Sequence, residues 1–466
     1  MQLSPKQRMA ISRQAVPAQD AAIRSGTFTE VNLGFTTELA RLEAERCLQC
    51  KNAKCIIGCP VSVGIPRFID FVAKGDMQAA AASLMSDNCL PAVTGRVCPQ
   101  EAQCESQCVR GVKGESVAIG ALERFVADWA RENNAADSVC AAPSGKTVGV
   151  VGSGPGGLTA AGELARLGHA VTVFEAFHTP GGVLVYGIPE FRLPKAIVAN
   201  EVERLQRLGV TIEVNAIVGR TYTVAELRER FDALFIAVGA GLPQFMNVPG
   251  ENLKGVYSAN EYLTRVNLMG AWDGDSRTPV LKGKRVVVVG GGNVAMDAVR
   301  TGKRLGATEA VIAYRRGKEE LPARLEEVHH AEEEGIRFEL LVAPLRVIGN
   351  AEGWVTGLVC QRMQLGEPDA SGRRKPEPVP GSEFTIDCDL VISAIGTRAN
   401  PLLTQTCPDL KLNKWGNVIV DQDLMSSIPG VFAGGDIVRG AATVILAMGD
   451  GKTAAKRIDA WLKQND

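Results

Sequence analysis

The pattern of apolar residues changes near residue 140 of this 466-residue chain. Before that point, apolar side chains recur at helical spacing through residues 36–50, 66–76 and 120–133. Such spacing is typical of amphipathic helices, and no segment in this part alternates as a β-strand does. The polar, small-residue stretch at 132–146 is then expected to be a linker. The pattern therefore predicts a helical domain over residues 1–140.

Beyond the linker, short apolar runs alternate with helical patterns. Residues 147–176 have the pattern of strand, glycine turn, helix and strand, and residues 283–316 repeat that order. Each segment is a βαβ unit, in which a helix joins two parallel strands. The sequence therefore predicts an α/β fold with parallel sheets behind the helical domain.

The first βαβ unit carries a glycine fingerprint, Gly152-Ser153-Gly154-x-x-Gly157. Glycines at this spacing allow a tight turn and let backbone N–H groups approach a pyrophosphate at the helix N-terminus. The next strand ends at Glu175, where a carboxylate can accept hydrogen bonds from an adenosine ribose. A turn that serves only packing is the alternative. Strand, glycines, helix and acid together favour a dinucleotide site.

The second βαβ unit carries a similar fingerprint, Gly290-x-Gly292-x-x-Ala295, in which Asn293 and Val294 stand between the last two members. The same argument predicts that this turn binds a second dinucleotide. Two such sites in one chain predict two Rossmann-like dinucleotide-binding domains.

The strand after the second fingerprint ends in Tyr314-Arg315-Arg316 and carries no acidic residue. Guanidinium groups at this place suit a 2′-phosphate, which favours NADPH over NADH as the ligand. The alternative is that both arginines are solvated surface charges.

With two dinucleotide sites, the sequence resembles the two-dinucleotide-binding-domain flavoprotein superfamily, which includes thioredoxin reductase and adrenodoxin reductase. Four motifs support the resemblance: Gly181-Gly182-x-Leu184, FIAVGA at 235–240, ISAIGT at 392–397 and VFAGGD at 431–436. The resemblance implies FAD and a nicotinamide cofactor. It also implies that these motifs supply cofactor contacts, from Gly182, Leu184, Gly239, Gly396, Gly435 and Asp436.

The order of the motifs implies that one domain is inserted in the other. The VFAGGD motif belongs to the FAD domain in that superfamily, yet it follows the NADP-type fingerprint here. The FAD-binding domain is therefore expected at 141–279 and 391–466, with the NADP(H)-binding domain inserted at 280–390.

Seven of the twelve cysteines lie in two short segments, and the fourth of them is followed directly by a proline: Cys47, Cys50, Cys55, Cys59, Cys98, Cys104 and Cys108. In a reducing cytosol such clustering indicates metal rather than disulfides. Zinc prefers paired C-x-x-C motifs, whereas a run that ends in Cys-Pro is closer to iron–sulfur patterns. Zinc and structural thiols are the alternatives.

The amino-terminal motifs narrow the resemblance to one family. They are EVNLGFTTELARLEAERCLQCKNAKC at 30–55, GCPVSVGIPRFI at 58–69, LPAVTGRVCPQEAQCESQC at 90–108 and AIGALERFVADWA at 118–130. They resemble the small (β) subunit of NADPH-dependent glutamate synthase. They are also similar to the large subunit of NADH-dependent ferredoxin:NADP+ oxidoreductase and to the amino-terminal part of dihydropyrimidine dehydrogenase.

This family resemblance implies a helical iron–sulfur domain with two 4Fe–4S clusters whose ligands interleave along the chain. One cluster would take Cys47, Cys50, Cys55 and Cys108. The other would take Cys59, Cys98 and Cys104, with Glu123 as its fourth ligand. The alternative for Glu123 is a surface carboxylate beside an apolar stripe.

Two further segments match the family on the flavin side. YGIPEFRLP at 186–194 supplies Arg192 as an implied FAD contact. RGAATVILAMGDGK at 439–452 contains Thr443 and is expected near the isoalloxazine ring. Plain core packing is the alternative for residues of the latter segment.

Charge and composition exclude some partners. A formal net charge of −1 gives no electrostatic reason to expect nucleic acid or an anionic membrane as a partner. The first residues lack a signal-peptide pattern and no long apolar run is present, so a cytoplasmic location is expected.

The motifs and the resemblance together predict an oxidoreductase that passes electrons from NADPH, through FAD and two 4Fe–4S clusters, to a larger subunit. The expected partner is the glutamate synthase large subunit. One alternative is the bifurcating ferredoxin:NADP+ oxidoreductase, with ferredoxin or a flavoprotein subunit as partner. The other is a non-enzymatic scaffold that binds zinc and nucleotide. No side chain is assigned an acid–base role.

Overall fold

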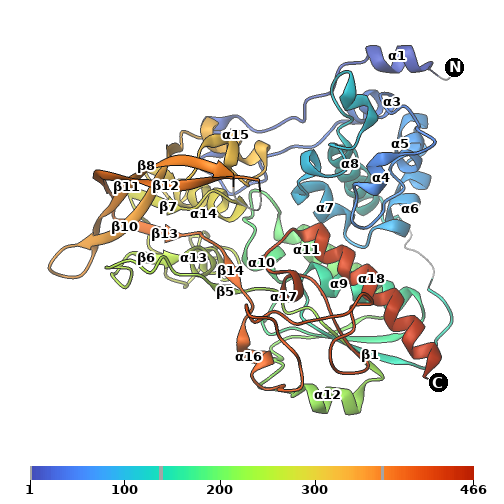
Figure 1. Ribbon diagram of the computed structural model, residues 1–466. Helices are drawn as coiled ribbons and strands as arrows, with labels where there is room; N and C mark the ends of the chain where they lie inside the picture. Colours follow the sequence, from blue (N-terminus) through green and yellow to red (C-terminus); the bar gives the residue numbers. More distant parts are fainter. Residues whose placement is uncertain (1–2, 136–139, 369–371, 466) are drawn as a thin grey trace.

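The computed structural model describes residues 3–135, 140–368 and 372–465. Residues 136–139 of the expected linker therefore lie outside the described residues. Figure 1 shows a helical domain beside two separate sheet-based units. The predicted fold class is confirmed: a helical domain precedes two parallel α/β units, and the second unit is inserted in the first.

The helical domain is built from short amphipathic helices. In α5, the buried side chains Ile65, Phe68, Ile69 and Val72 share one face, and Gly75 ends the helix with φ 76°. The elements are α1 (Pro5–Ala10), α2 (Ala21–Arg24), α3 (Thr37–Glu45), α4 (Lys54–Ile57), α5 (Ile65–Lys74), α6 (Met77–Asp87), α7 (Pro91–Val97), η1 (Gln100–Ala102), η2 (Val109–Val112) and α8 (Ile119–Glu132).

The first α/β unit is a five-stranded parallel sheet with the order β15-β4-β1-β2-β3. Its strands are β1 (Thr147–Val151), β2 (Ala170–Phe174), β3 (Thr211–Glu213), β4 (Ala233–Ile236) and β15 (Val431–Ala433). Its helices are α9 (Pro155–Arg166), α10 (Val183–Tyr186), α11 (Lys195–Arg207), α12 (Val224–Arg230), α16 (Pro401–Thr404), α17 (Asp436–Arg439) and α18 (Val444–Gln464).

The second α/β unit is also a five-stranded parallel sheet, with the order β6-β13-β7-β8-β9. Its strands are β6 (Val256–Ser258), β7 (Arg285–Val289), β8 (Glu309–Tyr314), β9 (Arg337–Leu340) and β13 (Leu390–Ser393). Its helical elements are α13 (Ala259–Val266), α14 (Asn293–Arg304), η3 (Lys318–Glu320) and α15 (Leu325–Glu333).

Two smaller sheets complete the fold. An antiparallel sheet of β10 (Val342–Gly349), β11 (Val355–Pro368) and β12 (Arg374–Asp387) extends from the second unit, at the left of Figure 1. The short strands β5 (Leu242–Pro243) and β14 (Thr397–Arg398) pair where the chain passes between the two units.

Strand membership makes the inserted unit wider than the expected range of 280–390. β6 precedes that range, and most of β13 follows it, yet both strands pair within the second sheet. The difference has a physical cause: β6 has only three residues, so its apolar pattern is too short to reveal a strand.

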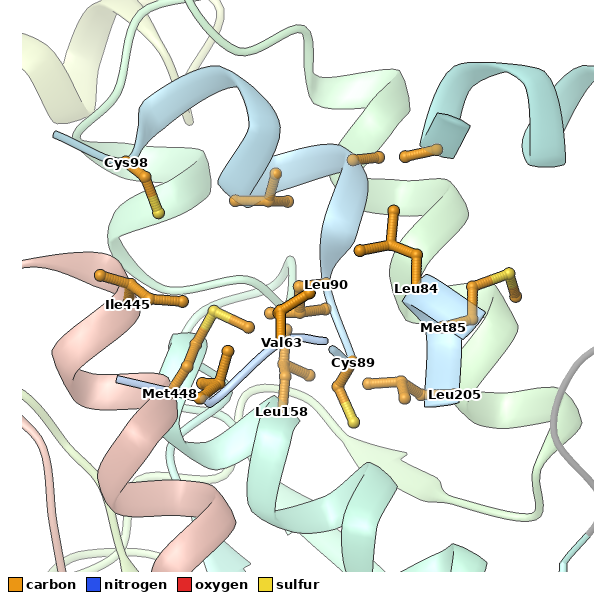
Figure 2. Packing of buried hydrophobic residues seen from close by; sticks show 14 of the residues in the cluster. Val63, Leu84, Met85, Cys89, Leu90, Cys98, Leu158, Leu205, Ile445 and Met448 are labelled. Carbon is orange, nitrogen blue, oxygen red and sulfur yellow. The ribbon is translucent and has the colours of Figure 1, made fainter. Parts of the chain in front are cut away.

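The helical domain and the first unit share one continuous apolar core. Figure 2 shows this packing, in which Ile445 and Met448 of α18 and Leu158 of α9 lie against Val63, Leu90 and Cys98 of the helical domain. Hydrogen bonds add to it, since the Lys452 ammonium donates to the Val61 carbonyl at 2.9 Å. Burial on this scale indicates that the two parts form one stable body.

A buried ion network connects the second unit to both other parts. Arg300 of α14 donates to Glu327 of α15 and to Glu334, the residue that caps α15, and Arg304 donates to Glu334 at 2.7 Å. Arg24 of the helical domain reaches Glu334 at 3.1 Å. All these side chains are enclosed, and Arg300 has no exposed surface.

Candidate functional site

The first glycine fingerprint forms the turn between β1 and α9. Gly152 has φ 101°, and a Cβ on Gly157 would stand 1.9 Å from the Gly152 carbonyl oxygen, so only glycine fits. Gly154 is the N-cap of α9, has no side chain to accept the first N–H groups, and borders open space. Free helix N–H groups beside open space are what a pyrophosphate requires, so this turn fits FAD.

Glu175 stands at the end of β2, beside this turn. Its carboxylate is buried and accepts hydrogen bonds from the Ser153 N–H at 3.0 Å, from the Ser153 hydroxyl and from the Phe177 N–H at 2.8 Å. These donors fix the position of the carboxylate next to the fingerprint. Its predicted role at a ribose is compatible with this position.

Other residues predicted for FAD gather at the same turn. A Cβ on Gly182 would stand 2.8 Å from Gly154 Cα, so the two backbones touch. Helix α18 crosses α9 closely, because a Cβ on Gly451 would stand 2.3 Å from the Gly156 carbonyl oxygen. The N-terminus of α18, capped by Thr443, is thereby brought toward the fingerprint.

Asp436 follows β15 and begins α17. Its carboxylate accepts a hydrogen bond from the Ala442 N–H at 3.2 Å, and burial raises the pKa of Asp436 to about 6. The preceding Gly435 donates its N–H to Asp450 at 2.9 Å. No role for Asp450 was predicted from the sequence. The signal that could have found it is a single carboxylate within the otherwise small and apolar segment 439–452.

For three other residues predicted to contact FAD, the structure shows surroundings unlike those at the fingerprint turn. Leu184 is fully buried, as core packing alone would require, and Gly239 has φ 69° with open space beside it. Arg192 is buried and paired with Asp297 at 2.7 Å and Glu327 at 3.1 Å, both in the second unit. These carboxylates raise the pKa of Arg192 against the effect of its burial. The structure therefore gives Arg192 a place in the ion network between the units.

The second fingerprint repeats the turn geometry between β7 and α14. A Cβ on Gly290 would stand 2.4 Å from the Ala394 carbonyl oxygen, which brings the segment of Gly396 beside the turn. Gly292 is the N-cap of α14 and has no capping side chain, and Val294 is exposed in the first helical turn. This turn therefore also fits a dinucleotide pyrophosphate.

Asn293 connects this second turn to the helical domain. Its side-chain oxygen accepts a hydrogen bond from the Arg324 N–H at 2.9 Å. The Arg324 guanidinium in turn donates to the Arg96 carbonyl and to the Gln100 side chain, each at 2.9 Å. Side-chain and backbone contacts thus run from the second fingerprint into the segment before Cys104.

The two arginines after β8 differ in exposure. Arg315 is exposed, whereas Arg316 is buried and donates from Nε to the Arg374 carbonyl at 2.8 Å. Arg315 is therefore the guanidinium with solvent access for a 2′-phosphate, while Arg316 is engaged at the start of β12, next to the β11–β12 turn.

The first cysteine set is Cys47, Cys50, Cys55 and Cys108, and all four line one hollow in the helical domain. Burial raises the pKa of Cys47 to about 12, and the thiols of Cys55, Cys108 and Cys50 add to that shift. Four thiols around one hollow suit a four-iron cluster.

The second cysteine set is Cys59, Cys98 and Cys104, with Glu123 beside them. Burial is the main cause that raises the pKa of each of these three thiols, and the charge of Glu123 adds to it for all three. The first set therefore lines one hollow, and the thiols of the second set lie within electrostatic range of Glu123.

Glu123 is buried, so the alternative of a surface carboxylate does not hold. Its Oε1 accepts hydrogen bonds from the Asn88 amide at 2.7 Å and the Thr94 hydroxyl at 2.6 Å. Helices α7 and α8 meet closely here, because a Cβ on Gly95 would stand 2.6 Å from the Arg124 nitrogen. Asn88 and Thr94 were not predicted, since their only signal is polarity within an apolar segment.

The second cysteine set lies on the side of the first unit. Pro60, next to Cys59, contacts α18, since a Cβ on Gly449 would stand 3.0 Å from the Pro60 carbonyl oxygen. Cys98 belongs to the apolar cluster that contains Ile445 of α18 (Figure 2). The same helix begins at Thr443, so it connects the predicted FAD turn with the second set.

Among residues 3–135, 140–368 and 372–465, no three His, Cys, Asp or Glu side chains converge closely enough to bind a single metal ion. No helix in the same ranges is long and apolar enough to cross a membrane.

Two family models match the chain. Residues 24–135 match dihydropyrimidine dehydrogenase domain II with its 4Fe-4S cluster, and residues 146–451 match pyridine nucleotide-disulphide oxidoreductase. The second match covers the whole of the first fingerprint and of the inserted unit. The predicted cofactor classes, FAD, NADP(H) and 4Fe–4S, agree with these models.

Individual relatives cover the chain to different extents. The glutamate synthase (NADPH) small chain of Azospirillum brasilense is 39% identical over 95% of this chain and 93% of its own length. The NADP(+)-dependent formate dehydrogenase subunit beta of Moorella thermoacetica is 42% identical over 88% of this chain, which spans 60% of that relative. The structure of FprA of Mycobacterium tuberculosis in complex with NADPH has the same fold over 68% of this chain and 85% of the FprA chain. The TM-score is 0.57, and the two sequences are 22% identical.

Proposed function

Because the chain belongs to the glutamate synthase small-chain family, an NADPH-dependent branch of the pyridine nucleotide-disulphide oxidoreductases, we propose that it is the electron-entry subunit of a larger enzyme. Electrons would pass from NADPH, through FAD and two 4Fe–4S clusters, to a larger partner subunit. The observation that carries the proposal is the separation of eight potential ligands into two sets, one of which lies beside α18.

The first unit would hold FAD and the second unit NADPH. When bound, FAD would take a hydride from NADPH and release the two electrons one at a time, which suits one-electron clusters. Gly152, Gly154 and Gly157 would cradle the FAD pyrophosphate, and Glu175 would accept from its ribose. Gly290 and Gly292 would do the same for NADPH, with Arg315 on the 2′-phosphate.

The helical domain would hold the two clusters in series. Cys59, Cys98, Cys104 and Glu123 would ligate the cluster on the FAD side, because Pro60, next to Cys59, contacts α18 and Cys98 belongs to the same apolar cluster as Ile445. The first cysteine set would ligate the outer cluster. Burial in the apolar core shared with the first unit keeps water from the inner site.

The partner we propose is the glutamate synthase large subunit, so that the assembled enzyme makes glutamate. Near-complete coverage of the Azospirillum small chain supports this partner. A formate-oxidising subunit is the second candidate, supported by the higher identity to the Moorella relative. Purification of the native complex and identification of its other subunits distinguishes the two.

Cofactor content tests the proposal directly. The purified chain is expected to be brown and to contain FAD and about eight iron atoms with as much acid-labile sulfide, as two four-iron clusters require. Anaerobic iron, sulfide and flavin assays measure this content. Stoichiometric zinc without sulfide would refute the cluster assignment.

NADPH preference should depend on Arg315. The Arg315→Ala variant is expected to lose a charge-assisted contact worth about 1.5–3 kcal/mol, which lowers kcat/KM for NADPH at least about tenfold and leaves that for NADH nearly unchanged. Dye reduction with each nucleotide measures the ratio. Arg220→Ala, also at an exposed arginine but in the first unit, is the control. Equal NADPH/NADH ratios in wild type and Arg315→Ala would remove this assignment.

A further inference from the structure

Exposed apolar side chains surround the first cysteine set. Ile57 is 87% exposed, Val112 79% and Val109 42%. Ile57 ends α4, the helix that contains Cys55, and Val109 lines the same hollow as the four cysteines. Large apolar side chains grouped on a surface are typical of a contact with another protein.

The two chain segments that carry these apolar residues also carry exposed lysines. In residues 48–58 and 106–116, the exposed charged side chains are Lys51, Lys54, Lys113 and Glu115. Lys54 lines the hollow of the first set, and Lys113 directly follows Val112. Three cations against one anion contrast with the net charge of −1 of the whole chain. The exposed charge of these two segments is therefore mainly positive.

We propose that Ile57, Val109 and Val112, with Lys51, Lys54 and Lys113, form a docking surface for a one-electron carrier protein whose redox group lies under an apolar centre with an acidic rim. We call these six residues the basic–apolar patch. The inference rests on the proposed function, because it places the exit for electrons at the first cysteine set. Each transfer oxidises this chain by one electron and reduces the partner by one, with no bond made or broken.

The two parts of the patch have different physical roles. Lysine charges attract an acidic surface over several ångströms and raise the association rate, an effect that salt screens. The apolar residues exclude water at short range and stabilise the final contact. Charge reversal and apolar truncation should therefore differ in their salt dependence.

The test uses the full cofactor-loaded chain with two carrier proteins of opposite charge. NADPH is the donor, an acidic [2Fe–2S] ferredoxin is the probe, and a basic c-type cytochrome is the final oxidant. Cytochrome reduction is measured with and without ferredoxin at low and high ionic strength. The variant is Lys51→Glu/Lys54→Glu/Lys113→Glu, and its matched control is Lys282→Glu/Lys411→Glu/Lys414→Glu, which reverses three exposed lysines elsewhere.

In the patch variant, the ferredoxin-dependent rate is expected to fall about tenfold or more at low ionic strength. The decrease should be much smaller in high salt. Its direct reduction of the basic cytochrome should rise instead, because repulsion becomes attraction. The control variant should match wild type in both reactions. Ile57→Asn should lower the ferredoxin-dependent rate severalfold at every ionic strength.

Iron content and the bleaching of flavin by NADPH, measured for each preparation, test the proposed function separately. A wild-type chain without iron or without bleaching would contradict that function. With both present, three results would overturn the docking proposal alone. The first is that the wild-type chain transfers no electrons to ferredoxin. The second is that the patch variant reduces ferredoxin at the wild-type rate. The third is that the patch variant reduces ferredoxin and the cytochrome more slowly by the same factor.

Discussion

Replacement of Arg300 by methionine is expected to lower the free energy of unfolding by about 3–5 kcal/mol. Arg300 has no exposed surface and donates to Glu327 and to both oxygens of Glu334, at 3.0 and 2.7 Å for the latter. Methionine fills a similar volume but leaves these carboxylates with less compensating charge in a dry site. An uncompensated buried charge costs far more than the ion pair contributes.

Thermal unfolding followed by circular dichroism measures this effect, and the melting temperature should fall by about 10 °C. Arg337→Met is the matched control in the same unit. Arg337 pairs with Glu339 at 3.2 Å but is 56% exposed, so its loss should change stability by no more than about 0.5 kcal/mol. If the two variants have the same melting temperature, the buried network contributes no more to stability than a surface ion pair.

Replacement of Glu123 by alanine is expected to remove the inner cluster or convert it to a three-iron form. FAD and the cluster of the first cysteine set should remain. Asn88 and Thr94 both donate to Oε1 of Glu123, which fixes the orientation of this carboxylate, much as outer hydrogen bonds orient metal ligands. NADPH should still bleach the flavin at a near-normal rate, whereas electron delivery to a protein carrier should fall by an order of magnitude or more.

Electron paramagnetic resonance of the reduced variant, together with its iron content, measures this outcome. Glu132→Ala is the control, because Glu132 lies on the same helix α8 and its side chain is 65% exposed. Asn88→Ala should weaken the inner cluster without abolishing it. Two intact cluster signals and wild-type delivery in Glu123→Ala would mean that another group completes the second set.

Local patterns in the sequence predicted those parts of the fold that depend on neighbours along the chain. The two glycine turns are examples, because tight turns and helix starts are determined within a few residues. The three-residue strand β6 escaped prediction, since its pairing with β13 depends on residues more than 130 positions away. The length of a strand limits what its pattern can reveal.

Long-range contacts explain which surroundings of the site residues the sequence could not predict. Arg192 was expected at FAD, but its carboxylate partners Asp297 and Glu327 follow it by more than 100 residues, and no local pattern connects them. Glu123 is expected to be a cluster ligand, and its place beside an apolar stripe left a surface carboxylate as the alternative. The close approach of α7 at Gly95 encloses it, and that approach depends on the absence of a single side chain.

The discontinuity of the first unit has a consequence for synthesis on the ribosome. Strand β4 is complete at Ile236, but the edge strand that pairs with it, β15, begins only at Val431. Until then the apolar edge of β4 has no partner, and unpaired edges of this kind promote aggregation. The inserted unit is translated during that interval. Early folding of the inserted unit would hold the two halves of the first sheet near each other, so mutations that slow it should lower the yield of soluble protein even when they leave the finished sheet intact.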